Sequence, residues 1–132
     1  MNGSRRFYER VRVEKEAIVY INNKEFDVEI KDIAEEGIAF TVNNDNPVLA
    51  NINISDILKF TAIDIYTYFD TVRTDVIVGR CKIIRIDDSL VDSNKKVIGC
   101  KFTNTSQDIL DYVSAKKVAE FVRDKTTVSK NL

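Results

Sequence analysis

The first half of the chain alternates hydrophobic and polar residues with the period of a β-strand. In KEFDVEIKDI (residues 24–33), Phe26, Val28 and Ile30 share one side and polar residues fill the other. Similar runs lie on either side of it, EAIVYI at residues 16–21 and GIAFTV at residues 37–42. Three strands are therefore expected here. The first two would be joined by a tight turn at Asn22-Asn23, because asparagine tolerates positive φ.

The second half continues the β pattern with one ambiguous segment. In residues 54–72, Leu58 and Phe60 would point to one face of a strand, but Ile57, Ile63 and Ile65 would point to the other. A bulge, or a strand buried on both faces, would produce this distribution. Two further runs, TDVIVGRCKIIRIDD and KKVIGCKFTN, are separated by the polar loop SLVDSN, which brings the expected number of strands to about six.

The period changes to that of a helix after residue 104. Thr105 or Ser106 is suited to cap a helix over residues 105–124, with Asp108 favourably placed in the first turn. One broad hydrophobic face is expected to dock on the sheet; it comprises Ile109, Leu110, Val113, Val118 and Phe121. The polar residues 125–132 are expected to form a frayed tail.

Together these elements indicate a mainly β protein. Short antiparallel strands without intervening helices usually close into a barrel, because closure removes exposed edges. We expect a six-stranded antiparallel β-barrel with one C-terminal α-helix. It would form a single domain over residues 1–124, of which residues 1–12 would be a flexible, arginine-rich leader.

Composition excludes several classes of function. The 20 Lys and Arg residues balance 21 Asp and Glu, so the chain lacks the broad positive field that duplex nucleic acid requires. Without histidine and without a CxxC motif, the usual zinc sites and the His-dependent catalytic arrangements are excluded, and no metal, cofactor or enzymatic activity is expected. No run is long enough to span a bilayer, so a cytoplasmic protein without membrane insertion is expected. Cys81 and Cys100 fit reduced core thiols.

Two short motifs point to a ligand. RRFYER contains Arg5, Arg6 and Arg10, and DIAEEG places Asp32, Ala34 and Gly37 at its first, third and sixth positions. In order and spacing they resemble the paired signature of PilZ domains, RxxxR followed by (D/N)xSxxG. Asp32 follows Arg10 by 22 residues. The resemblance covers nearly the whole chain, since the barrel and the closing helix also match.

The resemblance implies binding of cyclic di-GMP, a bacterial second messenger. By the family pattern, Arg6 and Arg10 would contact phosphate and a guanine edge, and Arg5 would stack on or clamp a second guanine. Asp32 would accept from guanine N–H groups, and Gly37 would allow close approach. Guanidinium groups match both phosphate and guanine in bidentate geometry. Ala34 departs from the pattern, which has serine, and losing one neutral hydrogen bond would weaken binding about fivefold.

Other residues have simpler interpretations. Tyr8, Tyr66, Tyr68 and Phe69 would make a base-stacking platform, but aromatic residues on strands are more often packing residues. Glu35-Glu36 point away from each other in an extended chain, which does not suit an acid–base pair. Asp87, Asp88 and Asp92 lack the spacing of a calcium loop and suit a solvated hairpin.

The sequence thus predicts a cyclic di-GMP receptor that signals to a protein target through ordering of its N-terminal arginine segment. By family analogy, that target would belong to motility, surface-attachment or polysaccharide machinery. The alternative is a PilZ-like adaptor that has lost nucleotide binding. A barrel that binds single-stranded nucleic acid is a third possibility, which the net charge of −1 supports least.

Overall fold

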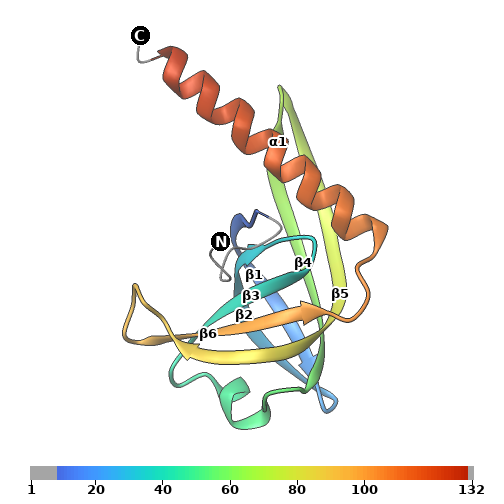
Figure 1. Ribbon diagram of the computed structural model, residues 1–132, viewed down its shortest axis with the longest axis vertical. Coiled ribbons are helices and arrows are strands. Elements are labelled where there is room, and N and C mark those ends of the chain that lie inside the picture. The colour runs from blue at the N-terminus through green and yellow to red at the C-terminus, as the bar shows by residue number, and fades with distance from the viewer. Residues whose placement is uncertain (1–8, 131–132) are drawn as a thin grey trace, which may run out of the picture.

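The computed structural model describes residues 9–130, with side chains described as far as residue 122 (Figure 1). Its elements are β1 (Val11–Ile21), β2 (Lys24–Ile33), β3 (Gly37–Asn43), the short 3-10 helix η1 (Pro47–Asn51), β4 (Ile57–Tyr68), β5 (Thr71–Asp88), β6 (Lys95–Phe102) and α1 (Gln107–Lys130). All strand pairs are antiparallel, and the order β1-β2-β3-β6-β5-β4 closes through the β1–β4 pair. The expected mainly β fold with one C-terminal helix is confirmed.

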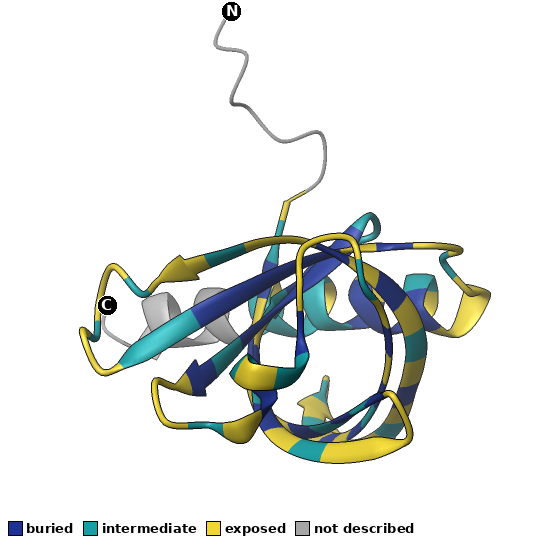
Figure 2. Cartoon of the chain, turned by 90° about the horizontal axis from the view of Figure 1, so that it is seen from below, coloured by how far each residue is buried: buried dark blue, intermediate teal, exposed yellow. Residues whose placement is uncertain are grey.

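The core forms where inward-facing residues of the six strands meet. Buried and exposed residues alternate along the strands (Figure 2). Phe40 and Phe60 are fully buried at its centre and meet edge to face, with ring centroids 5.6 Å apart. Cys81 and Cys100 are buried free thiols within this core, as the sequence predicted.

Two local predictions about turns and strand starts can be compared with the structure. Asn22 and Asn23 have φ values of 51° and 62°, which confirms the turn between β1 and β2. β1 begins at Val11, five residues before the expected strand, and so overlaps the last two residues of the predicted leader at residues 1–12. A bulge between Arg12 and Lys15, with Glu14 at φ 54°, interrupts the strand pattern and hid this early start from the sequence.

The ambiguous segment is a regular strand, and the expectation of a bulge or of burial on both faces was wrong. β4 pairs with β5 without any register shift from Ile57 to Tyr68. Leu58 and Phe60 face the core, whereas Ile63 and Ile65 remain 59% and 58% exposed. These two outward-facing side chains are hydrophobic, although no described residue covers them.

Helix α1 uses a narrower docking face than the one predicted. Ser106 Oγ accepts from the Ile109 backbone N–H at 3.2 Å, so Ser106 fulfils the predicted N-cap role. Ile109 and Val113 are buried as expected, but Val118 and Phe121 are 39% and 62% exposed. The reason is geometric: α1 crosses the β4–β5 hairpin and then continues beyond it (Figure 1). The helix also ends at Lys130, six residues after the predicted end at 124.

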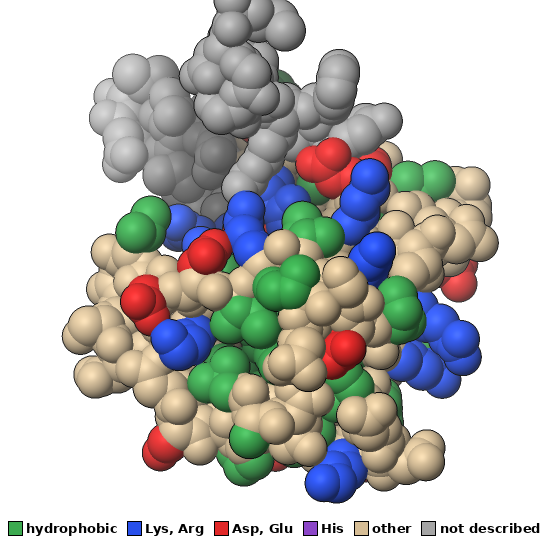
Figure 3. All heavy atoms as spheres, turned by 60° about the horizontal axis from the view of Figure 1, so that its bottom comes forward, with side chains coloured by type: hydrophobic (Ala, Val, Ile, Leu, Met, Phe, Trp, Pro, Cys, Tyr) green, Lys and Arg blue, Asp and Glu red, His purple; other side chains and the backbone are tan. Residues whose placement is uncertain are grey.

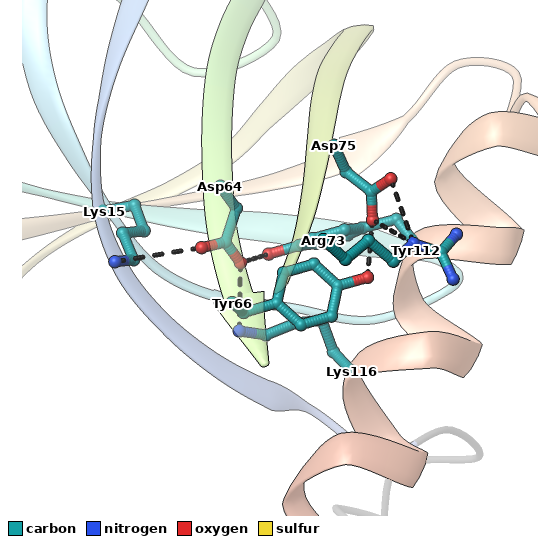
Figure 4. Close-up of polar contacts among 7 residues, drawn as sticks. All are labelled: Lys15, Asp64, Tyr66, Arg73, Asp75, Tyr112 and Lys116. Atoms are coloured by element: carbon teal, nitrogen blue, oxygen red, sulfur yellow. Dashed lines mark hydrogen bonds and ion pairs between the residues drawn. The ribbon is translucent and has the colours of Figure 1, made fainter. Parts of the chain in front are cut away.

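A buried polar cluster attaches α1 to the hairpin (Figure 4). Asp64 on β4 is completely buried, and its Oδ2 accepts from Tyr112 Oη at 2.7 Å and lies 2.9 Å from Lys116 Nζ. Lys116 also sits over the Tyr66 ring, 4.6 Å from its centroid. Because a buried carboxylate needs partners, Asp64 fixes the angle at which α1 crosses the sheet.

None of the described helices is both long and apolar enough to cross a membrane.

Candidate ligand-binding site

Arg10 and Asp32 form the centre of the candidate site. Arg10 Nε lies 2.5 Å from Asp32 Oδ1, and the two side chains are only 14% and 19% exposed. The β1–β2 register explains this contact, because Arg12 is paired with Asp32 and Arg10 precedes Arg12 by two residues. The two motifs, separated by 22 residues in sequence, therefore meet in space.

The loop between β2 and β3 is held in place by bonds on several sides. The Ala34 N–H donates to the Gly37 carbonyl at 2.9 Å, and the Glu36 carbonyl accepts from the Phe102 N–H at 2.9 Å. The Glu35 carbonyl accepts from Thr105 Oγ1 at 2.8 Å. The loop is thus fixed to the barrel through β6 and the segment before α1.

Gly37 is required for close approach between strands. A Cβ built on it would lie 2.3 Å from the Cys100 carbonyl oxygen of β6, far inside normal contact distance. None of the glycines in the described residues has positive φ. Close approach, rather than an unusual backbone angle, is therefore the reason for glycine at this position.

A hollow of about 250 Å³ lies beside this loop. Its lining residues come from the start of β1, the β2–β3 connection, β5 and β6; they are Arg10, Glu36, Gly37, Ile84, Arg85, Gly99, Cys100 and Lys101. Arg85 lies across Gly99, where an added Cβ would come within 2.8 Å of Arg85 Cγ. Gly99 therefore provides the space in which the Arg85 side chain lies flat.

The charges around the hollow favour an anion. Arg10, Arg85 and Lys101 contribute three cations, against the single carboxylate of Glu36 among the lining residues. Arg85 Nε is 3.3 Å from Asp87 Oδ2, but the two side chains are 48% and 60% exposed, so this pair is weak and easily exchanged. A phosphodiester with an adjoining polar ring edge suits three such donors beside a glycine edge.

The predicted site residues have different positions in the structure. Asp32 pairs with Arg10, and Gly37 lines the hollow. Ala34 is fully buried and does not line the hollow. Arg5 and Arg6 lie outside the described residues, and so does Tyr8.

Sequence reasoning missed the residues contributed by β5 and β6. Arg85, Gly99 and Lys101 lie far from both motifs in sequence, and only the barrel topology brings them to the site. One signal was present: an isolated glycine inside a strand pattern, such as Gly99 in KKVIGCKF, often marks close approach of another group.

The alternative site residues have structural roles. Glu35 Oε1 accepts from Lys117 Nζ at 3.1 Å and so connects the β2–β3 loop to α1. Glu36 instead lines the hollow, so the two carboxylates do not act as an acid–base pair. Tyr66 packs edge to face on Tyr112, with ring centroids 6.1 Å apart, which fits the packing interpretation. Asp88 accepts from Lys96 Nζ at 2.6 Å on the exposed β5–β6 hairpin.

Comparisons with known proteins identify the family of the chain. The family model of the PilZ domain matches residues 4–115, most of the chain, and the chain therefore belongs to the PilZ family. No curated protein matches the sequence.

Solved structures with the same fold include PilZ proteins from two organisms. The PilZ domain of Escherichia coli YcgR with c-di-GMP has a TM-score of 0.61 and 13% identity, covering 98% of this chain and 100% of that one. Escherichia coli YcgR in complex with c-di-GMP has a TM-score of 0.62 and 10% identity, covering 97% of this chain and 51% of that one. Bacillus subtilis Inhibitor of motility (MotI/DgrA) has a TM-score of 0.60 and 14% identity, covering 94% of this chain and 53% of that one. The chain thus spans about half the length of the latter two chains.

Proposed function

We propose that this protein binds cyclic di-GMP at the hollow beside the Arg10–Asp32 pair. The observation that carries the proposal is the arrangement itself: Arg10, Asp32 and Gly37 meet where Arg85 and Lys101 add positive charge. Membership of the PilZ family and the c-di-GMP complexes of YcgR support the choice of ligand.

Each residue has a chemical role in this proposal. Arg10 donates to a phosphate or to the O6/N7 edge of guanine, since its guanidinium has five N–H donors and Asp32 occupies only part of them. Asp32 accepts from guanine N–H groups with its second oxygen. Arg85 and Lys101 neutralise phosphate charge, and Arg5 and Arg6 close over the ligand from the N-terminal side.

In this proposal, the N-terminal arginine segment carries the signal. The N-terminal segment becomes ordered over the ligand, and a protein target recognises this change in the cytoplasm of a bacterium. The fold shared with an inhibitor of motility supports a target in motility machinery. The reaction class is binding only, without catalysis.

A second candidate is an adaptor that no longer binds nucleotide. Two observations favour it: Ala34 lacks the hydroxyl of the family motif, and Arg10 is already paired with Asp32. A role in binding single-stranded nucleic acid receives less support. On the face shown in Figure 3, basic and acidic side chains are interspersed rather than gathered in a stripe.

Calorimetric titration of the purified protein with cyclic di-GMP distinguishes these functions. If the protein is a receptor, cyclic di-GMP should bind saturably and cyclic di-AMP should not. The Arg6→Ala variant should no longer bind cyclic di-GMP. A stoichiometry near two ligands per chain would indicate an intercalated ligand dimer. Absence of binding at high micromolar ligand would reject the receptor function in favour of the adaptor.

A further inference from the structure

The outer face of the β4–β5 hairpin carries an uninterrupted block of uncharged residues. Strand pairing places these residues opposite one another in four successive rows: Thr61 with Val78, Ile63 with Val76, Ile65 with Thr74, and Thr67 with Val72. Every position is aliphatic or threonine, and no charged residue interrupts the block. We refer to these eight residues as the hairpin face.

The hairpin face is exposed to an unusual degree. Val72, Val76 and Val78 are 70%, 61% and 45% exposed, in addition to Ile63 and Ile65. The five aliphatic side chains present on the order of 500 Å² of apolar surface, toward the upper end of the roughly 300–600 Å² of the largest apolar patch on a typical monomer. The three threonines bring the whole hairpin face to on the order of 700 Å². The largest exposed apolar patch of a protein is often an interaction site.

The opposite side of the same hairpin is already occupied. Tyr66 packs against Tyr112 of α1, and the buried Asp64 binds Tyr112 and Lys116. The helix therefore covers the inner side of the hairpin beyond the barrel and leaves the outer side for a partner (Figure 1).

We propose that the hairpin face is a symmetric interface with a second copy of this chain. An uncharged surface of β-branched side chains can face a second copy of itself without burying an unpaired charge, and two such sheet faces pack about 10 Å apart. Two copies together would bury on the order of 1,400 Å², within the range of stable specific interfaces. Depletion of charge at the centre is also the composition that homodimer interfaces have.

The neighbouring charges select one orientation. Directly beside the hairpin face, Lys59 is paired with Arg80, and neither makes an ion pair with an acid in the described part of the chain. Same-face residues repeat about every 6.6 Å along a strand, so this basic row is about 16 Å from the centre of the hairpin face, which lies between the Ile63–Val76 and Ile65–Thr74 rows. With the strands of the two copies antiparallel, the two basic rows lie about 33 Å apart, well beyond the screening length of roughly 8–10 Å. A parallel orientation would place them opposite each other.

The proposed dimer leaves the nucleotide site open. Arg85 lies seven residues beyond Val78 along β5, on the order of 20 Å away. The interface therefore does not depend on ligand binding, and it is tested without nucleotide. Its failure would leave the proposed receptor function unaffected.

Sedimentation velocity of the full chain from about 1 to about 100 µM provides the test. The expected result is a monomer–dimer equilibrium that Val76→Lys weakens at least tenfold, because the new charge would be buried at the centre of the interface. Val91→Lys is the matched control, since Val91 is 92% exposed on the distant β5–β6 loop. Val76→Thr retains the side-chain shape and should weaken the dimer less than Val76→Lys, which guards against an effect of misfolding.

A chain that stays monomeric at about 100 µM would overturn the proposal. A dimer that Val76→Lys leaves intact would also overturn it, because the contact would then lie on another surface.

Discussion

Arg10 Nε lies 2.5 Å from Asp32 Oδ1 although 22 residues separate the two in sequence. The contact joins two motifs that are individually weak signals. Arg10 lies just before β1 and Asp32 near the end of β2, and the antiparallel pairing of these strands brings them together. It also means that the unliganded site contains its own counter-ion. A ligand must therefore use the donors of Arg10 that Asp32 leaves free, or exchange with Asp32.

Replacing Arg10 should reduce ligand affinity much more than replacing its neighbour. Arg10→Ala removes a charge-assisted hydrogen-bond donor worth about 1.5–3 kcal/mol, which corresponds to a loss of at least about tenfold in cyclic di-GMP affinity. Arg12→Ala is the control, because the Arg12 side chain is 79% exposed and its ion pair is with Glu14, at 3.6 Å, rather than with Asp32. Calorimetry should show the two variants to differ. Equal effects would mean that Arg10 does not bind the ligand directly.

Arg85 is expected to be the third cation of the site. Arg85→Ala should weaken cyclic di-GMP binding about fivefold to tenfold, since one partly screened charge pair is lost. Arg80→Ala, on the same strand but outside the hollow, should leave the affinity unchanged. If both variants bind as the unaltered chain does, β5 makes no contribution to the site.

Gly37→Ala should destabilise the fold as well as the site. The new methyl group would meet the Cys100 carbonyl oxygen at 2.3 Å, and backbone atoms cannot move aside as a side chain can. Forced overpacking of this kind costs about 1–3 kcal/mol in unfolding free energy, measurable by urea denaturation. Gly79→Ala should cost less, because its nearest neighbours are the side chains of Phe60 and Ile109. The reverse order would contradict the packing argument.

Stability should fall at alkaline pH because of buried tyrosines. Burial, followed by the hydrogen bond to Asp64, raises the pKa of Tyr112 above its ordinary value. The unfolded chain loses this proton near pH 10 and the folded chain does not, so the unfolding free energy is unaffected at lower pH and decreases above about pH 10. Tyr112→Phe should reduce the slope of unfolding free energy against pH in that range, whatever its effect at pH 7. An unchanged slope would show that Tyr112 ionises equally in both states.

The sequence predicted much of this architecture, because strand patterns and turn residues are local signals. KEFDVEIKDI alternates cleanly, and β2 occupies those ten residues. The errors came from long-range effects. Ile63 and Ile65 suggested burial, but a hydrophobic residue does not reveal whether a covering partner is part of the same chain. Val118 and Phe121 fit a helical face, yet the sheet ends before the helix does.

The candidate site was only partly predictable for the same reason. Arg10, Asp32 and Gly37 lie in motifs whose spacing is visible in the sequence, whereas Arg85 and Gly99 reach the hollow through the pairing of β3, β5 and β6. Asp64 gave no sign of its burial, since its partners Tyr112 and Lys116 follow about fifty residues later.

Titration of isotope-labelled protein with cyclic di-GMP, followed by amide NMR, tests the central claim most directly. We expect saturable shifts concentrated at Arg10, Gly37, Arg85, Gly99 and Lys101, with the outer face of the β4–β5 hairpin unaffected. Absence of shifts at saturating ligand, or shifts confined to residues away from the hollow, would contradict it.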